Sequence, residues 1–293
     1  MLFVPADSER FLAKAGQRGA DALILDLEDA VARPAKAAAR ANLAPFTQRL
    51  RSAGVPIHIR VNNEPGLLQD DLEAAVAAGP DGLLMPKVDT PAQMQQLDAD
   101  LHRLEKKNGR APGSIRVLAL IESPLGLCNA LEIARSSPRL SGLLFGTEDF
   151  GAAMGIESRP EGMAGPAQTM AIAAAAAGLQ PMGLPGSVAE FSDAGAYRAL
   201  AVQARRIGMR GAICIHPAQV PIINEVFGGS EEEAAAARRL LEVFDASVAA
   251  GKGAVAHEGR MIDEPIAIRA RRFLARHDVL KARRNATRRE AAQ

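Results

Sequence analysis

The sequence has few of the residues that build cross-linked or aromatic-rich proteins. Among 293 residues it contains 2 cysteines, 1 tyrosine and no tryptophan. Cys128 and Cys214 lie far apart, and neither has a metal-ligand spacing around it. This fits a reducing cytoplasm better than a disulfide framework. We expect both cysteines to be core residues.

Long apolar runs are also missing. No run approaches the roughly 20 residues that a transmembrane helix needs. The stretch from Met170 to Leu179 is short and rich in alanine, which favours a helix packed against other protein. The start, MLFVPADSER, lacks the basic and apolar regions of a signal peptide. These absences predict a cytoplasmic protein without a membrane partner.

Neither sign of charge is in excess. Lys and Arg number 35 against 34 Asp and Glu, which leaves a formal charge of +1. A nucleic-acid surface would need a basic excess to neutralise phosphates, so nucleic acid is excluded as the expected partner. The hydrophobic fraction of 48% and the charged fraction of 24% are typical of a globular protein with a substantial core. The expected partner is a small molecule.

Short runs rich in Val, Ile and Leu alternate with longer segments of helical period, which is typical of a parallel sheet crossed by helices. The runs are apolar at consecutive positions, as strands covered on both faces are. We place about eight of them, which predicts an α/β fold of the (β/α)8 TIM barrel type. The expected strands are residues 2–5, 22–29, 56–62, 82–88, 116–122, 142–149, 181–185 and 211–217.

Capping patterns mark where helices begin. Thr90 is followed by Pro91, and Ser123 by Pro124, so each pair offers a capping side chain and then a proline. Helices are therefore expected directly after these residues, with strands ending just before them.

A further helix begins beyond the last expected strand. Ser230 and Glu233 form a capping box that opens an alanine-rich helix to about residue 250. A loop and a final helix with one apolar side follow. We therefore expect a TIM barrel over residues 1–228 and a C-terminal helical extension over residues 229–293. The extension has a surface to bury, either on its own barrel or on a neighbouring subunit.

Polar side chains stand at the ends of otherwise apolar strands. In a TIM barrel the chemistry takes place at the carboxyl ends of the strands, so these side chains are the candidate functional residues. They are Asp26, Glu28, Asp29, Arg60, Asn62, Lys87, Glu122, Glu148, Asp149 and His216.

Glu122 and Asp149 end successive expected strands, which lie about 4.8 Å apart in a sheet. Their carboxylates could therefore hold one cation between them. Because the ligands are oxygens, a hard ion such as Mg²⁺ is favoured over Zn²⁺. The alternative is that both acids cap helices or pair with arginines.

Arg60 and Lys87 each have a functional and a structural interpretation. The planar guanidinium of Arg60 would suit capture of a substrate carboxylate, but it could equally pair with Glu28 or Asp29. Lys87 could hold substrate, form a Schiff base if burial lowers its pKa, or make a structural ion pair.

Two further polar residues have simpler structural interpretations. His216 stands alone before a proline, which favours a hydrogen-bonded structural residue. Asp263 stands shortly before Pro265 and has the pattern of a helix N-cap.

Taken together, these motifs resemble one family, the HpcH/HpaI aldolase and citrate lyase beta-subunit superfamily of CoA-ester lyases. The resemblance covers nearly the whole chain. It is carried by LFVPADSERFLAKA, GADALILDLEDAV, HIRVN, LLMPKV, LALIESPLGL, LLFGTEDF, ICIHPAQVPIINEVF and GRMIDEP.

The resemblance implies a Mg²⁺-dependent enzyme that cleaves or forms a carbon–carbon bond beside a CoA thioester. By motif, Glu122 and Asp149 are similar to the metal ligands, and Arg60 to the residue that holds the oxo-acid carboxylate. Asp263 corresponds to an acid or base that an adjoining subunit supplies, which replaces its capping interpretation. Glu28 and Asp29 would lie behind the metal waters or substrate. For Lys87 we keep the substrate contact that its position at a strand end suggests.

The implied reaction is cleavage of a citryl-, malyl- or citramalyl-type 3-hydroxyacyl-CoA to acetyl-CoA, or a related acyl-CoA, and an oxo acid. The alternatives are a thioesterase, a malate-synthase-like condensing enzyme, and a lyase subunit that acts on an acyl group held by a carrier protein. A homotrimer, or a pair of trimers, is expected from the resemblance alone.

Overall fold

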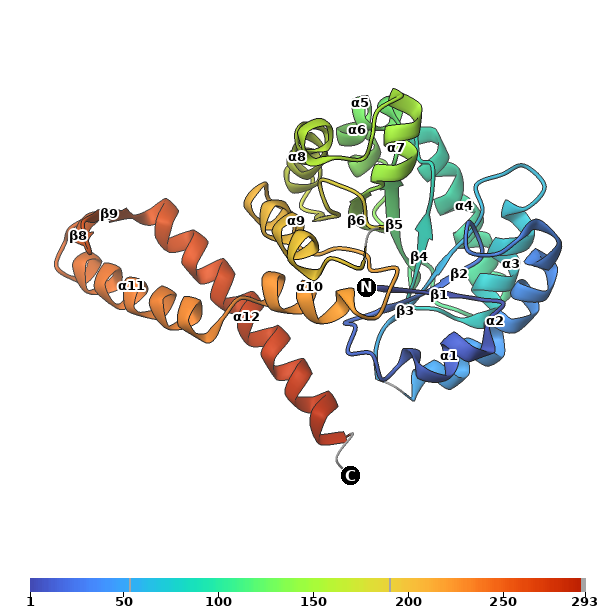
Figure 1. The fold of residues 1–293 in the computed structure, drawn as a ribbon, viewed down its shortest axis with the longest axis horizontal. Coiled ribbons are helices and arrows are strands. Elements are labelled where there is room, and N and C mark those ends of the chain that lie inside the picture. The colour runs from blue at the N-terminus through green and yellow to red at the C-terminus, as the bar shows by residue number, and fades with distance from the viewer. Residues whose placement is uncertain (53, 190, 291–293) are drawn as a thin grey trace. The chain divides into compact units, whose positions relative to one another are not determined.

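The computed structural model describes residues 1–52, 54–189 and 191–290. The chain divides into two compact units, Met1–Ile223 and Asn224–Gln293, and helix α10 (Gln219–Gly228) runs across the division. Each unit is described by itself below. Figure 1 labels the elements along the chain.

The first unit alternates strands with helices. Its strands are β1 (Leu2–Pro5), β2 (Leu23–Asp26), β3 (Ile57–Arg60), β4 (Gly82–Met85), β5 (Arg116–Ile121), β6 (Leu140–Phe145) and β7 (Gln180–Met182). Its helices are α1 (Glu9–Ala15), the 3-10 helix η1 (Arg33–Ala35), α2 (Lys36–Arg51), α3 (Leu68–Ala78), α4 (Pro91–Lys107), α5 (Pro124–Cys128), α6 (Ala130–Arg135), α7 (Thr147–Met154), α8 (Pro160–Ala176) and α9 (Ala194–Arg206).

The strands form one curled parallel sheet in chain order from β1 to β7, with the helices of the unit around its outside (Figure 1). Pro5 is in register with Asp26, and Asp26 with Arg60, so the carboxyl ends of the first three strands meet at one edge. This arrangement confirms the predicted alternation of strands and helices.

The eighth expected strand, 211–217, is not a regular strand. Only an isolated parallel bridge joins Cys214 to Leu2, although the Phe3 amide donates to the Cys214 carbonyl at 2.9 Å. The backbone N–H groups of Ile215 and His216 donate instead to the side chain of Gln219, at 2.9 and 3.1 Å. The segment therefore leaves the sheet soon after Cys214.

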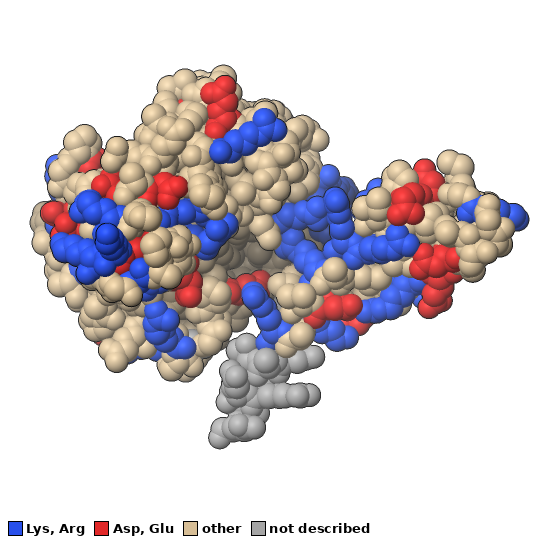
Figure 2. All heavy atoms as spheres, turned by 180° about the vertical axis from the view of Figure 1, so that it is seen from behind, with Lys and Arg blue, Asp and Glu red and all other residues tan. Residues whose placement is uncertain are grey.

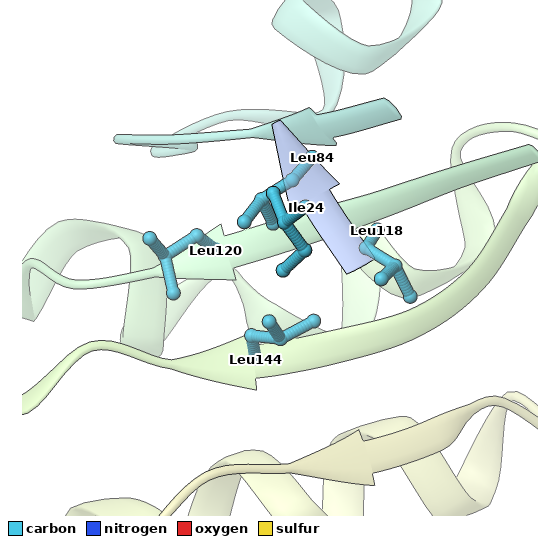
Figure 3. Packing of buried hydrophobic residues seen from close by; sticks show 5 residues of the cluster. All are labelled: Ile24, Leu84, Leu118, Leu120 and Leu144. Atoms are coloured by element: carbon cyan, nitrogen blue, oxygen red, sulfur yellow. The ribbon is translucent and has the colours of Figure 1, made fainter. Parts of the chain in front are cut away.

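Residues two apart along the strands point to the same face, and one set fills the inside of the curl. Ile24, Leu84, Leu118, Leu120 and Leu144 form a buried cluster there (Figure 3). Phe3, Met182 and Ile213 pack against it. Toward the carboxyl ends of β2, β3 and β5, the next side chains on this face are those of Asp26, Arg60 and Glu122. The alternation thus aims these polar side chains inward at the end of an apolar core.

Both expected helix starts have the predicted caps. Thr90 and Gln93 form a capping box before α4, and the Ser123 side chain accepts a hydrogen bond from the Gly126 amide at 2.9 Å before α5. Each cap satisfies amide groups that the first helical turn leaves without partners.

A buried ion pair lies among α4, β5 and β6. The guanidinium of Arg139 donates two hydrogen bonds of 2.8 Å to the carboxylate of Glu105, which is fully buried. Asp98 also pairs with Arg139. The backbone amides of Gly113 and Ile115 donate to Glu105 at 2.8 and 2.9 Å, so its charge is well satisfied.

The second unit consists of two helices and a hairpin. Its elements are α11 (Glu231–Ala249), β8 (Ala254–His257), β9 (Arg260–Asp263) and α12 (Glu264–Glu290), after the end of α10. The predicted capping box of Ser230 and Glu233 is present at the start of α11. Phe244, Ile262 and Ala267 form its buried core.

The hairpin was not expected, because residues 251–263 have the composition of a loop. Strands β8 and β9 pair antiparallel and place His257 opposite Arg260. The two residues between them, Glu258 and Gly259, have φ angles of 49° and 75°. Positive φ at both central residues is the geometry of the tight turn that suits a hairpin's twist.

The expectation that both cysteines lie in the core is wrong for one of them. Cys214 is buried, but Cys128 is exposed at the end of the short helix α5. The helix has only one buried residue, Gly126, so it has too little of an inner face to cover the thiol.

The surface agrees with the balanced charge of the sequence. On the face drawn in Figure 2, each unit carries both Lys or Arg and Asp or Glu side chains. Within the described ranges, no helix combines the length and apolar character needed to cross a membrane.

Candidate active site

A cavity of about 430 Å³ opens at the carboxyl ends of the strands. Its wall is apolar where it meets the inside of the sheet, at Phe3, Leu120 and Leu144. Its polar lining comes from the carboxyl ends of β2 and β3 and from residues that follow β2, β5 and β6: Asp26, Asp29, Arg60, Glu122, Glu148 and Asp149. The structure therefore brings most of the predicted site residues to one place.

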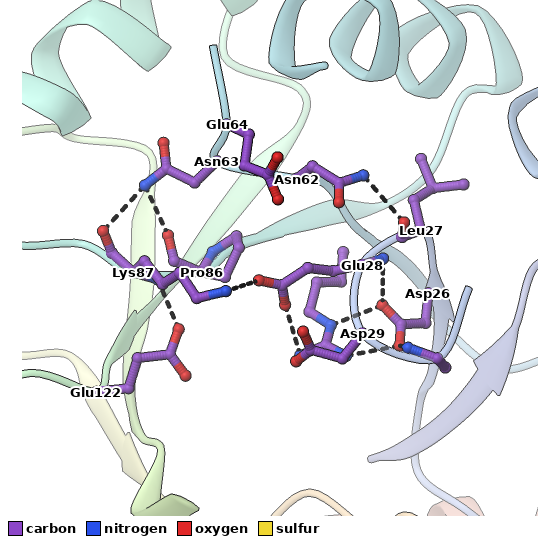
Figure 4. A network of polar contacts seen from close by, with 12 residues as sticks. Asp26, Leu27, Glu28, Asp29, Asn62, Asn63, Glu64, Pro86, Lys87 and Glu122 are labelled. Atoms are coloured by element: carbon purple, nitrogen blue, oxygen red, sulfur yellow. Dashed lines mark hydrogen bonds and ion pairs between the residues drawn. The ribbon is translucent and has the colours of Figure 1, made fainter. Parts of the chain in front are cut away.

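The guanidinium of Arg60 contacts three carboxylates, those of Asp26, Glu28 and Asp29, which are labelled in Figure 4. Its Nε and Nη2 donate to the two oxygens of Asp26, each at 2.6 Å. Nη1 lies 2.8 Å from Glu28 Oε2 and 3.3 Å from Asp29 Oδ2. The ring of Phe3 lies against the guanidinium, 4.5 Å from its central carbon. The ion-pair interpretation of Arg60 is therefore what the structure shows.

Burial and charge act in opposite directions in this group. Burial disfavours the charge of Arg60, but the hydrogen bonds and charges of Asp26, Glu28 and Asp29 outweigh it and raise the pKa of Arg60. Burial raises the pKa of Glu28, despite the neighbouring cations Arg60 and Lys87. Asp29 differs from the other acids, because 61% of its side chain is exposed and its contact with Arg60 is the longest.

Two side chains hold the backbone of the loop after β2 by hydrogen bonds to its carbonyl groups. The buried ammonium of Lys36, at the start of α2, donates to the carbonyls of Leu27 and Glu28 at 2.7 Å each. Asn62 Nδ2 donates to the Leu27 carbonyl at 2.9 Å. The loop therefore presents Glu28 and Asp29 in one arrangement.

Lys87 contacts both the carboxylate group around Arg60 and Glu122. Its Nζ lies 2.7 Å from Glu28 Oε1, and its backbone N–H donates to Glu122 Oε1 at 2.7 Å (Figure 4). Partial burial lowers the pKa of Lys87, but the bond to Glu28 and the nearby Asp29 and Asp149 outweigh this and raise it. A raised pKa does not favour the Schiff-base alternative, which needs a neutral amine, and the contact with Glu28 is the ion pair of the other interpretation.

Glu122 is buried at the end of β5, with 5% of its surface exposed. Burial, followed by the charge of Asp149, raises the pKa of Glu122 to about 8. Asp149 was expected to end a strand. It lies instead in the first turn of α7, together with Glu148. Strand β6 ends at Phe145, and Gly146 caps the helix, so the turn back toward β5 brings Asp149 close to Glu122.

The two carboxylates suit a hard divalent cation. Among the described residues, neither Glu122 nor Asp149 forms an ion pair with Lys, Arg or His within 4 Å, so no cation in direct contact offsets the repulsion that Asp149 exerts on an ionised Glu122. A cation bound between them would compensate it, and carboxylate oxygens are the ligands that Mg²⁺ prefers. Within the same described part of the chain, no group of three or more His, Cys, Asp or Glu has metal-binding geometry. The candidate metal centre therefore consists of two carboxylates.

Asp263 and His216 each make contacts of a structural kind. Asp263 is half-buried at the end of β9 in the second unit, and its Oδ1 accepts a 3.4 Å hydrogen bond from the Ile266 amide, as a helix cap does. His216 Nδ1 accepts from the Ala218 amide at 3.2 Å, and its ring stacks on Phe191 with centroids 4.5 Å apart. His216 thus has the structural role expected for it.

Some contacts of the site were not predicted. The sequence indicated that Asp26 is near the site but not that its two oxygens would accept hydrogen bonds from Nε and Nη2 of Arg60. Lys36 gave no signal, since a lysine at the start of a helix is ordinary on the surface. Phe3 could have been found from the inner-face alternation of β1, which it shares with the apolar cluster.

Comparison with known proteins agrees with this geometry. The family model HpcH/HpaI aldolase/citrate lyase matches residues 1–217. The citrate lyase subunit beta of Escherichia coli (strain K12) is 35% identical over 284 residues, covering 95% of this chain and 93% of the relative. The L-malyl-CoA/beta-methylmalyl-CoA lyase of Cereibacter sphaeroides (strain ATCC 17029) is 34% identical over 288 residues, covering 89% of each chain.

A solved structure also resembles this chain. The protein CitE from Mycobacterium tuberculosis, in complex with magnesium, acetoacetate and coenzyme A, superposes with a TM-score of 0.75 at 30% identity. The match covers 94% of this chain and 97% of that one. The family predicted from the motifs is thereby confirmed, and the chain belongs to the HpcH/HpaI aldolase/citrate lyase family.

Proposed function

We propose that this chain is a Mg²⁺-dependent lyase that cleaves a carbon–carbon bond of a 3-hydroxyacyl-CoA ester. The substrate is of the citryl, malyl or citramalyl type, and the products are acetyl-CoA, or a related acyl-CoA, and an oxo acid. The observation that carries the proposal is the buried Glu122 beside Asp149 in a cavity that also contains Arg60. The lyase names of the relatives support it.

Glu122 and Asp149 are the proposed ligands of the magnesium ion. Bound there, the ion would supply Lewis-acid stabilisation of oxygen charge in the substrate, a contribution of several kcal/mol. Glu28 and Asp29 would orient water or substrate beside it, as carboxylates behind a metal site do.

Arg60 is the proposed contact for the carboxylate of the oxo-acid half. Asp26 occupies its Nε and Nη2, so the substrate would approach Nη1. The exposed Asp29, at 3.3 Å, is the weakest partner on that side and the one a substrate carboxylate would displace. Lys87, whose side chain is 47% exposed, would add a second positive charge at the mouth of the cavity.

The bond cleavage needs one proton acceptor and one proton donor. A base takes the hydroxyl proton, the adjacent carbon–carbon bond breaks, and its electron pair forms the enolate of the thioester. We assign delivery of the proton to the enolate carbon to Asp263, supplied by another subunit of a homotrimer or a pair of trimers. Its half-buried position on a hairpin, rather than in the core of its unit, is compatible with this role.

We also propose that residues 211–214 complete an eight-stranded TIM barrel. The segment hydrogen-bonds on one side to Phe3 of β1 and to Met1 just before that strand. On the other side the amide of Gly183, the residue after β7, donates to the Gly211 carbonyl at 2.9 Å. Contacts to the first and last strands of the sheet are what closure requires.

The test is product analysis. The purified protein is incubated with Mg²⁺ and a panel of 3-hydroxyacyl-CoA esters, and the products are identified by mass spectrometry. We expect an acyl-CoA and an oxo acid in equal amounts, and we expect Glu122→Ala to abolish their formation. Retained turnover in that variant would contradict the metal assignment.

The same product analysis, repeated with acyl-CoA plus oxo acid and with an acyl group on a carrier protein, separates the alternatives. Free CoA without acetyl-CoA would indicate a thioesterase, and product formed only from acyl-CoA and oxo acid would indicate a condensing enzyme. Inactivity toward every free CoA ester, restored by an acyl group on a carrier protein, would indicate a lyase subunit of a larger complex.

A further inference from the structure

The backbone at Lys87 has an unusual conformation. Its φ angle is 52°, in the left-handed region that residues with a side chain rarely adopt. Such strain persists only where the surroundings fix it, and it is concentrated at functional sites.

Three hydrogen bonds account for this conformation. The Lys87 N–H donates to Glu122 Oε1 at 2.7 Å, and the Lys87 carbonyl accepts from Asn63 Nδ2 at 2.9 Å. The next amide, that of Val88, donates to the Leu120 carbonyl on β5 at 3.2 Å. The reversal of direction at Lys87 therefore lets one amide reach the carboxylate of Glu122 while the following amide stays on the sheet.

The other oxygen of Glu122 lies against a glycine. A Cβ added to Gly146 would stand 2.7 Å from both Cβ and Oε2 of Glu122. The φ angle of Gly146 is −97°, which any residue can adopt, so the backbone does not require glycine here. The space that Glu122 occupies requires it.

We propose that Lys87 and Gly146 are positioning residues that fix the orientation of the Glu122 carboxylate toward a divalent cation. The Lys87 amide holds Oε1, and the bare face of Gly146 leaves room for Oε2. This rests on the proposed role of Glu122 as a metal ligand. The backbone amide of Lys87 positions Glu122, and the ammonium group of Lys87 is not needed for this.

Two pairs of variants test this, with Mn²⁺ binding measured by electron paramagnetic resonance. Lys87→Asn and Lys87→Val both remove the ammonium, but asparagine tolerates the left-handed region and valine does not. Gly146→Ala is paired with Gly165→Ala, whose Cβ would have nothing within 4 Å. We expect Lys87→Val to bind Mn²⁺ ten- to a hundred-fold more weakly than Lys87→Asn, and Gly146→Ala more weakly than Gly165→Ala by a similar factor.

Thermal unfolding in chelator separates positioning from general destabilisation. If Lys87→Val unfolds at a lower temperature but its folded form binds Mn²⁺ as Lys87→Asn does, the proposal is overturned. Should Gly146→Ala fail to fold, the Lys87 pair decides. A wild-type protein that binds no Mn²⁺ would overturn the metal role of Glu122 itself, whereas equal binding in all four variants would overturn only the positioning role.

Discussion

Replacing Glu122 by glutamine should stabilise the metal-free protein at high pH. The pKa of Glu122 is raised from its ordinary value of 4.5 to about 8, by burial first and by Asp149 second. Between these two pH values the folded protein holds a proton that the unfolded chain has lost, so the folded state loses stability as the pH rises. A difference of roughly 3.5 pKa units corresponds to at most about 5 kcal/mol.

Glutamine has the shape of the protonated acid and can still accept the hydrogen bond of the Lys87 amide. We therefore expect the wild type and Glu122→Gln to have similar free energies of unfolding near pH 5. By pH 9 the variant should be more stable by about 3–5 kcal/mol. Added Mg²⁺ should reduce this difference by stabilising the wild type alone.

The assay is urea unfolding in chelator at pH 5, 7 and 9. Glu148→Gln serves as the control, because Glu148 is an exposed acid in the same helical turn and should show no such gain. Parallel pH profiles for the wild type and Glu122→Gln would refute the reasoning, since the carboxylate would then carry no uncompensated charge.

Three further outcomes are expected. Chelation should abolish turnover and Mg²⁺ or Mn²⁺ should restore it; activity that survives dialysis against chelator would exclude the metal role. Arg60→Lys should lower kcat/KM roughly a hundred-fold, because an ammonium cannot make the paired bonds to Asp26; an unchanged value would remove Arg60 from the site. Glu105→Gln should lower the free energy of unfolding in urea by about 3–5 kcal/mol, because it leaves Arg139 buried without its full counter-charge. The Mn²⁺ affinity should stay unchanged. A loss of stability below about 1 kcal/mol would show that this ion pair is unimportant.

Local patterns in the sequence were sufficient to predict much of the fold. Thr90 and Ser123 marked helix starts correctly because a cap depends on residues within one turn. The apolar runs of β1 to β6 identified strands because both faces of the curled sheet are covered. The loop that became the β8–β9 hairpin was missed, since its turn depends on Glu258 adopting a positive φ without an Asn or Asp signal.

The site was only partly predictable. The acids and Arg60 were found because strand ends meet at one edge of a parallel sheet. Which acid each cation would bind was not, since the choice of Asp26 by Arg60 depends on side-chain geometry across two strands. The left-handed backbone of Lys87 was beyond sequence reasoning, because it arises from contacts to β5 and to Asn63 rather than from neighbouring residues.

The most direct measurement is a crystal structure of the protein soaked in Mn²⁺, with the anomalous signal used to locate the ion. We expect one peak between the carboxylates of Glu122 and Asp149, within coordination distance of an oxygen of each. A map with no peak there, and with the two carboxylates turned away from each other, would contradict it.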